Sequence, residues 1–280
     1  MTCAVCHEKV PPNVRNCPSC QADVGFPNVR ATQTTKEINA LKKRVEDSSV
    51  STGLRGCKSV LDRFERTVLK SEAVFCQSLD LVLDLVSREN KLYISFHKQV
   101  AAGLRLPKDD AWEIGRPAVE STLFPHYHEE INFTCLTLNG TGLTNYGAYS
   151  IVLKDRMISL RSSVFEENPF LFMEKHRIVA GHSIPPGYRA SWNDRGLLAR
   201  AKLHSRIDKN TTDDQFPDIL MQPGASSAVD EFIEVHIFGP IHPTSFDRIV
   251  GPKPTRKHDL ALWKSLQSKC KNHGIILEEK

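Results

Sequence analysis

The chain has 280 residues, of which 40% are hydrophobic and 25% are charged, a composition typical of globular proteins. Its length suggests one large domain with a small one attached. The net charge of +4 is compatible with a nucleic-acid partner without requiring one. No apolar run approaches the ~20 residues that a membrane helix needs, and the first residues show no signal segment. We therefore expect a cytoplasmic protein without a membrane partner.

Four cysteines at the start of the chain follow the pattern Cys-x-x-Cys, ten residues, Cys-x-x-Cys: Cys3, Cys6, Cys17 and Cys20. Each pair can turn two thiolates toward one metal ion, and two pairs complete a tetrahedron suited to Zn²⁺. Residues 1–30 are therefore predicted to form a zinc ribbon that depends on structural Zn²⁺ for its folding. A redox pair is the alternative, but the strand-to-helix junction typical of redox Cys-x-x-Cys motifs is not visible in this sequence.

Residues 31–106 are predicted to be a helical arm. Thr34 or Thr35 can cap a first helix, and a heptad-like series of apolar residues starting at Leu61 predicts one or two more helices, packed as a hairpin or a coiled coil. We expect this segment to be a spacer or a dimerising stalk. A protein partner such as an antitoxin could bind to the arm or to the ribbon.

The third predicted domain, residues 107–280, has β-rich runs after a Pro-rich connector at 107–125. The expected elements are strands at 131–138, 148–154 and 157–164, an irregular segment at 170–224 with a helical patch near 196–203, and a helix at 258–271. A long irregular segment is typical of a lid, a binding loop or a disordered region.

The stretch 231–239 has the alternating pattern of a strand. Ile233, Val235 and Ile237 make one face wholly aliphatic, and this face is expected to point into a core. Glu234 and His236 project together from the other face. The pattern favours either a solvated edge strand or a carboxylate and an imidazole at the boundary between a core and a cleft.

Several nucleotide-binding motifs are absent from the sequence, including the Gly-x-x-x-x-Gly-Lys-Ser/Thr loop and the Gly-x-Gly-x-x-Gly turn. His126 and His128 could belong to a metal-dependent nuclease site or to a surface turn. The Asn139–Gly142 loop could approach a phosphate with its backbone N–H groups, or it could be an ordinary hairpin turn.

Four short motifs nevertheless follow one another along the C-terminal half of the chain: Tyr146-Gly147, Ile151-Val152-Leu153-Lys154, Arg161-Ser162-Ser163, and the segment from Glu234 to Gly239 with Ile241 after it. In this order the chain resembles poorly characterised bacterial ADP-ribosyltransferase-like families. The resemblance covers roughly residues 130–280. It implies an α+β protein in which the zinc ribbon and helical arm precede an ADP-ribosyltransferase-like split β-sandwich, with NAD⁺ bound in its cleft.

The resemblance also implies roles for individual residues. Glu234 matches the family's catalytic glutamate, which stabilises the oxocarbenium-like ribosyl cation formed when the nicotinamide bond breaks. His236 would help to position the acceptor or the ribose. The implied NAD⁺ contacts are Thr137, Asn139, Thr141, Tyr146, Arg161 and Ser162. For Tyr146 the alternative is packing in the core, and for Arg161 it is a surface salt bridge.

The sequence departs from the family pattern in two places. Phe232 stands where arginine-modifying members carry a second glutamate, and the first predicted strand lacks an arginine. These departures, together with the ribbon, favour a nucleic-acid acceptor, either RNA or DNA. The expected setting is a bacterial toxin or a phage-defence effector. The alternatives are a protein-modifying enzyme and a non-enzymatic zinc-ribbon adaptor with an inactive β-domain.

Overall fold

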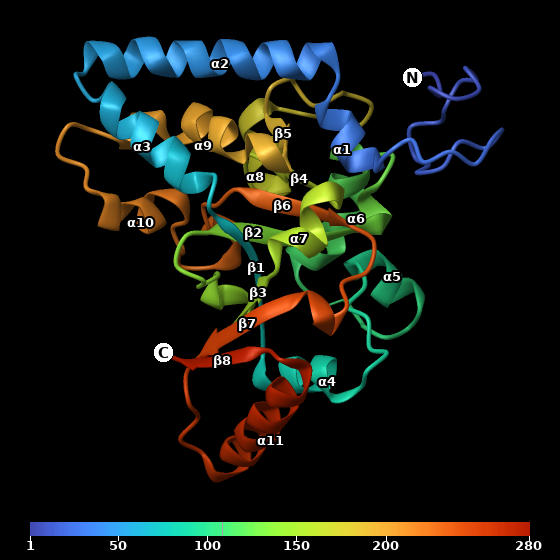
Figure 1. Cartoon of the computed structure of the whole chain (residues 1–280), viewed down its shortest axis with the longest axis vertical. Helices are drawn as coiled ribbons and strands as arrows, with labels where there is room; N and C mark the ends of the chain where they lie inside the picture. The colour runs from blue at the N-terminus through green and yellow to red at the C-terminus, as the bar shows by residue number, and fades with distance from the viewer. Residues whose placement is uncertain (108) are drawn as a thin grey trace.

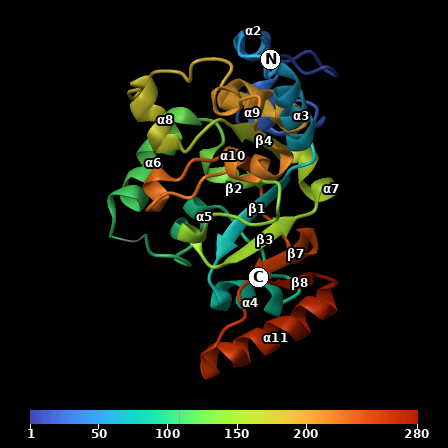
Figure 2. The same cartoon turned by 90° about the vertical axis from the view of Figure 1, so that its left-hand side faces the viewer.

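The computed structural model describes residues 1–107 and 109–280. These residues form a mixed α/β protein, with eight strands in one sheet and helices against both sheet faces (Figures 1 and 2). The strands are β1 (Glu72–Gln77), β2 (Ile131–Thr137), β3 (Tyr149–Leu153), β4 (Ser162–Phe165), β5 (Arg189–Ser191), β6 (Glu234–Phe238), β7 (Phe246–Gly251) and β8 (Ile276–Glu279). The helices are α1 (Pro27–Thr32), α2 (Thr35–Leu54), α3 (Lys58–Val68), α4 (Leu79–Ser87), α5 (Phe96–Ala101), α6 (Ala111–Leu123), α7 (Asp155–Ile158), α8 (Pro169–His176), α9 (Arg195–Leu203), α10 (Phe216–Leu220) and α11 (Lys257–His273).

The strand order in the sheet is β5-β4-β6-β2-β1-β3-β7-β8. All neighbouring strands are antiparallel except β7 and β8, which are parallel. The strands of the described residues thus form one continuous sheet, where the sequence led us to expect two facing sheets. Strand β6 lies between β2 and β4, so Glu234 is flanked by Cys135 on one side and Phe165 on the other.

The larger hydrophobic core lies on the sheet face that carries Val235 and Ile237. Helices α2, α3, α9 and α10 cover one part of this face, and α4 and α11 cover another. Phe64 of α3 and Phe216 of α10 meet edge to face with their ring centroids 5.2 Å apart. The wholly aliphatic register expected for this strand is therefore confirmed as the core face.

A second apolar cluster covers the opposite face of β6. Leu123 at the end of α6, Phe124, and Phe172 of α8 pack there with Phe165 of β4. Strand β6 is consequently buried on both sides, and the expectation of a solvated edge strand is wrong.

The expected helical segment 31–106 is interrupted by a strand. The helix after Thr34 is confirmed as α2, whose first turn is capped by the Thr34 hydroxyl accepting the Glu37 N–H at 3.3 Å. Residues Glu72–Gln77, however, form β1 at the centre of the sheet, between β2 and β3. Ala73, Val74, Phe75 and Cys76 are all buried. An apolar run buried on both faces has no alternation, so periodicity alone cannot distinguish it from a helix.

Two other expectations in the C-terminal half need correction. The third expected strand begins only at Ser162, because α7 and a 3-10 turn at Ser159–Arg161 precede it. The segment 170–224 is structured, since it contains α8, β5, α9 and α10. The strands expected at 131–138 and 148–154, the helical patch near 196–203 and the final helix are confirmed within one or two residues. Among the described residues, the helices are too short or too polar to cross a membrane.

Candidate functional site

The N-terminal ribbon consists of two equivalent turns, separated by 14 residues in the sequence. In the first turn the His7 N–H donates to the Cys3 carbonyl at 3.0 Å, and in the second the Gln21 N–H donates to the Cys17 carbonyl at 2.8 Å. His7 and Gln21 both have left-handed backbone conformations, with φ of 60° and 61°. Each Cys-x-x-Cys pair is therefore folded into the same tight knuckle.

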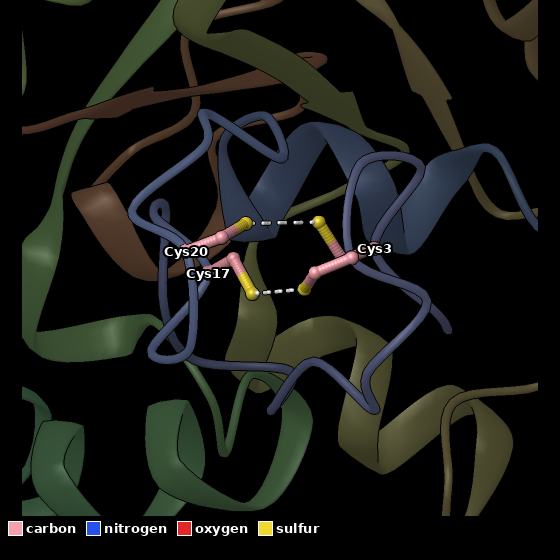
Figure 3. A group of neighbouring side chains, drawn as sticks. Cys3, Cys17 and Cys20 are labelled. Atoms are coloured by element: carbon pink, nitrogen blue, oxygen red, sulfur yellow. Dashed lines mark hydrogen bonds between the residues drawn. The ribbon is translucent and has the colours of Figure 1, made fainter.

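The two knuckles bring the thiols of Cys3, Cys6, Cys17 and Cys20 together (Figure 3). All four sulfur atoms lie within 4.8 Å of one another, with Cys3 Sγ 3.6 Å from Cys20 Sγ and Cys6 Sγ 3.5 Å from Cys17 Sγ. A Zn–S bond of about 2.3 Å implies sulfur–sulfur distances of about 3.8 Å in a regular tetrahedron. The cluster thus has the size and the donor atoms that a structural Zn²⁺ needs, as the spacing predicted.

The four thiols of the cluster differ in pKa: the pKa of Cys6, despite an opposing backbone hydrogen bond from Glu8, is raised to about 12 by its thiol neighbours, and that of Cys20 is also raised, whereas those of Cys3 and Cys17 are lowered. Hydrogen bonds from the backbone of Cys6 and then of Val5 lower the pKa of the Cys3 thiol to about 6. The backbone of Cys20 acts first in lowering the pKa of Cys17. Within residues 1–107 and 109–280, the four cysteines are the one group of His, Cys, Asp or Glu residues close enough to hold a metal ion. His126 and His128 do not form such a group.

Helix α1 attaches the ribbon to the sheet next to His236. Asn28 is fully buried, and its side-chain N–H groups donate to the carbonyl of Arg161 at 3.1 Å, to the hydroxyl of Ser163 at 3.1 Å and to the carbonyl of His236 at 2.9 Å. The Phe26 ring packs on the Phe238 ring with centroids 5.5 Å apart. The ribbon is therefore anchored on β4 and β6.

The Glu234 and His236 side chains form a hydrogen-bonded pair, with Glu234 Oε2 2.7 Å from His236 Nε2. Only 5% of Glu234 and 1% of His236 are exposed. Three aromatic rings surround the imidazole, with centroids 4.5 Å away for Phe124, 5.0 Å for Phe133 and 5.8 Å for Phe165. The carboxylate and imidazole predicted to lie side by side are thus inside an aromatic enclosure.

Burial in this enclosure favours the uncharged form of both groups. Burial raises the pKa of Glu234 well above its usual range, with a further increase from Glu120 and an opposing effect of Arg116. Burial also lowers the pKa of His236 to about 3, assisted by Arg189. These two directions favour the pair in which the Glu234 carboxyl group holds the proton and donates it to the unprotonated Nε2 of His236.

A buried ion pair on α6 lies close to Glu234. Glu120 is 2% exposed and accepts a hydrogen bond from Arg116 Nε at 2.7 Å, while its other oxygen is 2.6 Å from His97 Nε2. The Arg116 guanidinium stacks 5.3 Å from the centroid of Phe133, which also contacts His236. Burial lowers the pKa of Arg116, but Glu120 and then Glu234 outweigh this effect and raise it.

A pocket of about 520 Å³ opens beside His97, within the size range of small-molecule sites. Its walls come from α5, α6 and the neighbouring loops, through Phe96, His97, Lys98, Val100, Ala101, Pro107, Glu113, Ile114, Pro117 and Glu129. The His97–Glu120–Arg116 series connects this pocket to the electrostatic environment of Glu234.

Tyr146 lies over the same region on a surface loop. It is 48% exposed, and its pKa is raised by burial and then by the negative charges of Glu234 and Asp230. Position 147 of the Tyr146-Gly147 motif requires glycine for a steric reason. Its φ is 148°, and a Cβ atom there would lie 2.3 Å from the carbonyl carbon of Gln77. Tyr146 is thus accessible at the surface, and its contact with NAD⁺ stays a prediction.

Arg161 and Ser162 are located elsewhere. The Arg161 guanidinium donates to the carbonyls of Phe238 at 2.6 Å and Pro240 at 2.9 Å, so it fixes the end of β6. Ser162 is opposite Ile237 in the sheet and donates to the Ile158 carbonyl at 2.8 Å. Because Ile237 and Glu234 point to opposite faces, Ser162 does not share a face with the glutamate. A role for either residue in NAD⁺ binding stays a prediction.

The loop after β2 is held by its own polar side chains. The Thr137 hydroxyl lies 2.8 Å from the Thr141 carbonyl and 3.1 Å from Asn139 Oδ1. Asn139 Oδ1 also accepts the backbone N–H and the hydroxyl of Thr141, at 3.1 and 2.6 Å. These bonds are those of a tight polar turn. NAD⁺ binding by Thr137, Asn139 and Thr141 likewise stays a prediction.

Sequence reasoning missed Arg116, Glu120 and His97. Residues 107–125 were expected to be a connector because Pro107, Pro117 and Pro125 suggested broken structure. The segment instead contains α6, with the Asp110 side chain capping its N-terminus and Pro117 inside the helix. The signal that could have found the pair is the spacing of Arg116 and Glu120, four residues apart on one helical face.

Comparison with known proteins gives no identification: no protein-family model matches the chain, and no curated protein matches it.

Proposed function

We propose that this protein is a cytoplasmic NAD⁺-dependent ADP-ribosyltransferase that modifies a nucleic acid, as a bacterial toxin or phage-defence effector. The four ordered motifs support the proposal, as does one observation above all. Glu234 is held on strand β6 with His236 as its hydrogen-bond partner at 2.7 Å, and the buried Glu120–Arg116 ion pair of α6 acts on its pKa. A preorganised carboxyl group of this kind is what stabilisation of a ribosyl cation requires.

In the proposed reaction, the bond between the ribose C1′ and the nicotinamide nitrogen breaks, and its electron pair leaves with nicotinamide. A lone pair of the acceptor base then forms the new bond to C1′, and the acceptor loses a proton to the solvent. The ionised form of Glu234 stabilises the positive charge on the ribose. Because burial favours the neutral form of Glu234 in the free protein, the positive charge of the nicotinamide ring of bound NAD⁺ would promote its ionisation. His236 would fix the orientation of the carboxyl group.

Access to Glu234 in this proposal requires two loops to separate. Leu143 and Phe232 pack on Cys135, the β2 neighbour of Glu234. Asn145 ties the two loops together by donating to Asp230 Oδ1 at 2.9 Å and to the Gly224 carbonyl at 3.2 Å. The two hydrogen bonds of Asn145 are exposed or partly buried, but Leu143, Phe232 and Asp230 are buried, so separating the loops would also expose apolar surface to water.

A non-enzymatic adaptor is the second candidate. The observation that favours it is the burial of Glu234, whose hydrogen bond to His236 gives the carboxyl group a structural role in the core. In such a protein the zinc ribbon and helices would bind a partner, and the sheet would be a scaffold.

One experiment separates the two candidates. Purified protein is incubated with labelled NAD⁺ and, in turn, with RNA, DNA and a cell-protein extract. The variants are Glu234→Gln, which preserves the shape and hydrogen bonding of the neutral acid, and Glu46→Gln, the same change at an exposed position of α2. The proposal expects transfer by the wild type and Glu46→Gln, and a loss of at least about 100-fold in Glu234→Gln.

The outcomes are distinct. Transfer to one acceptor class names the substrate. Absence of transfer by folded, zinc-containing wild type would favour the adaptor. Equal transfer by Glu234→Gln would show that the glutamate has no catalytic role.

A further inference from the structure

Positive charge is concentrated near the C-terminus of the chain. Residues 252–273 contain six Lys or Arg residues and one Asp, a net charge of +5, although the whole chain has a net charge of only +4. The remainder of the protein therefore has a net charge of −1. The basic residues are Lys253, Arg256, Lys257, Lys264, Lys269 and Lys271, and the acidic one is Asp259.

Helix α11 arranges three of these lysines in a row. Lys257, Lys264 and Lys271 are spaced by seven residues, so each is displaced by only about 20° around the helix from the one before. They are about 10 Å apart along the axis and cover about 21 Å in total. All three are exposed.

The opposite side of α11 is committed to the core. Trp263, Leu266 and Cys270 are buried in the main hydrophobic cluster, about 130° around the helix from the lysine row. Leu260 and Leu262 are half-buried, and no bulky apolar residue of α11 is fully exposed, as an interfacial helix that enters a membrane would require.

Among the described residues, the lysines of this row have no carboxylate partner. Within residues 1–107 and 109–280, no ion pair involves Lys257, Lys264 or Lys271, whereas other lysines such as Lys58 and Lys98 do have carboxylate partners. The one carboxylate of α11, Asp259, has a side chain that is 39% exposed, is 3.2 Å from His258 and lies about 140° around the helix from the lysine row. The positive charges of the row thus remain available to an anionic partner.

We propose that the lysine row of α11 binds the phosphate backbone of a nucleic acid. Regularly spaced, unpaired lysines on a rigid helix suit a polymer with regularly spaced negative charges, and binding is driven by release of counterions from the phosphates. That this surface docks the acceptor of the transferase reaction rests on the proposed function. The binding itself does not depend on NAD⁺.

Because of the position of α11, nucleic-acid binding by this helix can be tested independently of any binding by the ribbon. Helix α11 lies at one end of the molecule, whereas α2 and the zinc ribbon lie at the other (Figures 1 and 2). Changes to the two ends can therefore be compared in the same protein.

The test is the salt dependence of binding of labelled single-stranded RNA and duplex DNA to the full chain, without NAD⁺, by fluorescence anisotropy. The variant carries Lys257→Gln, Lys264→Gln and Lys271→Gln. The matched control carries Lys36→Gln, Lys42→Gln and Lys43→Gln, three exposed lysines of α2 with the same total charge change. Anionic phospholipid vesicles are a third probe.

The α11 variant is expected to bind more weakly, and the slope of log K against log salt should decrease in magnitude by about 2 for single strands or about 2.7 for duplex. The α2 control should keep the wild-type slope. Equal losses in both variants, absence of binding by the wild type, or binding to vesicles alone would each overturn the proposal. If the wild type transferred no label from NAD⁺ in the earlier assay but still bound nucleic acid through the lysine row, the proposed enzymatic function would be refuted. The proposed binding surface on α11 would not be affected.

Discussion

The zinc ribbon and the Glu234–His236 pair are ordered by opposite means. The ribbon places four thiols within 4.8 Å of one another and has few apolar side chains to hold them, so a cation must offset their charge. The Glu234–His236 pair lies inside aromatic and aliphatic packing and avoids charge altogether, by keeping a proton on the carboxyl group. One region thus has the geometry of a metal site and is expected to depend on an added ion, whereas the other depends on tertiary burial. Asn28 connects the two through its bond to the His236 carbonyl.

The largest expected effect comes from removing a metal ligand, which should disorder the ribbon and leave the sheet folded. Cys17→Ser is expected to abolish binding of one zinc ion per chain, because structural sites of this kind contribute roughly 10–16 kcal/mol of binding free energy that is also folding free energy. Metal analysis should show the loss, and hydrogen exchange should become fast in residues 1–25 while β2 and β6 stay protected. Cys57→Ser is the matched control, since Cys57 is equally buried but outside the cluster. Unfolding of the sheet in Cys17→Ser would show that the regions are one cooperative unit.

The next effect concerns the sheet alone. His236→Ala is expected to lower the free energy of unfolding by about 4 kcal/mol, because it leaves a cavity among three phenyl rings and a buried Glu234 hydroxyl without an acceptor. Urea unfolding would measure the change, and zinc content should stay at the wild-type level. The control, His258→Ala, removes a side chain that is 83% exposed and should change stability by less than about 0.5 kcal/mol. A loss below 1 kcal/mol in His236→Ala would contradict the tight packing of this enclosure.

The smallest effect tests the neutrality of the pair. The pKa of Glu234 is raised on folding, so its contribution to stability is present below pH 4.5 and is lost as the pH rises through the folded pKa. The pKa of His236 is lowered from 6.5 to about 3, so its contribution is present above pH 6.5 and is lost as the pH falls. Between pH 4.5 and 6.5 the two contributions change in opposite directions and cancel in the wild type.

Single variants should expose each contribution. Relative to the wild type, Glu234→Gln should gain stability as the pH rises from 4.5 to 6.5, and His236→Gln should lose it. Each slope should approach about 1.4 kcal/mol per pH unit. Urea unfolding at several pH values would measure both slopes. Parallel curves for the two variants would mean that the pair is ionised in the folded protein.

The sequence alone determined the features that depend on local chemistry. The spacing of Cys3, Cys6, Cys17 and Cys20 predicted the cluster because a knuckle needs only two cysteines and a turn between them. Thr34 or Thr35 was predicted to cap the start of α2, because an N-cap acts on the next three residues, and Thr34 is the residue that does so. The alternation around Val235 predicted β6 and its core face, since side chains alternate along any strand.

Tertiary structure decided what depends on neighbours distant in the sequence. Strand β1 has no sequence signal because burial on both faces erases alternation, and its partners are more than 50 residues away in β2 and β3. The burial of Glu234 could not be deduced from β6, because α6 and α8 supply the covering layer. Arg116 and Glu120 acquired their importance in the same way, when α6 packed over that strand. Local propensity can specify a strand and the direction of its side chains, but the medium that surrounds a carboxyl group, and with it the pKa, is set by whichever segments the fold brings against it.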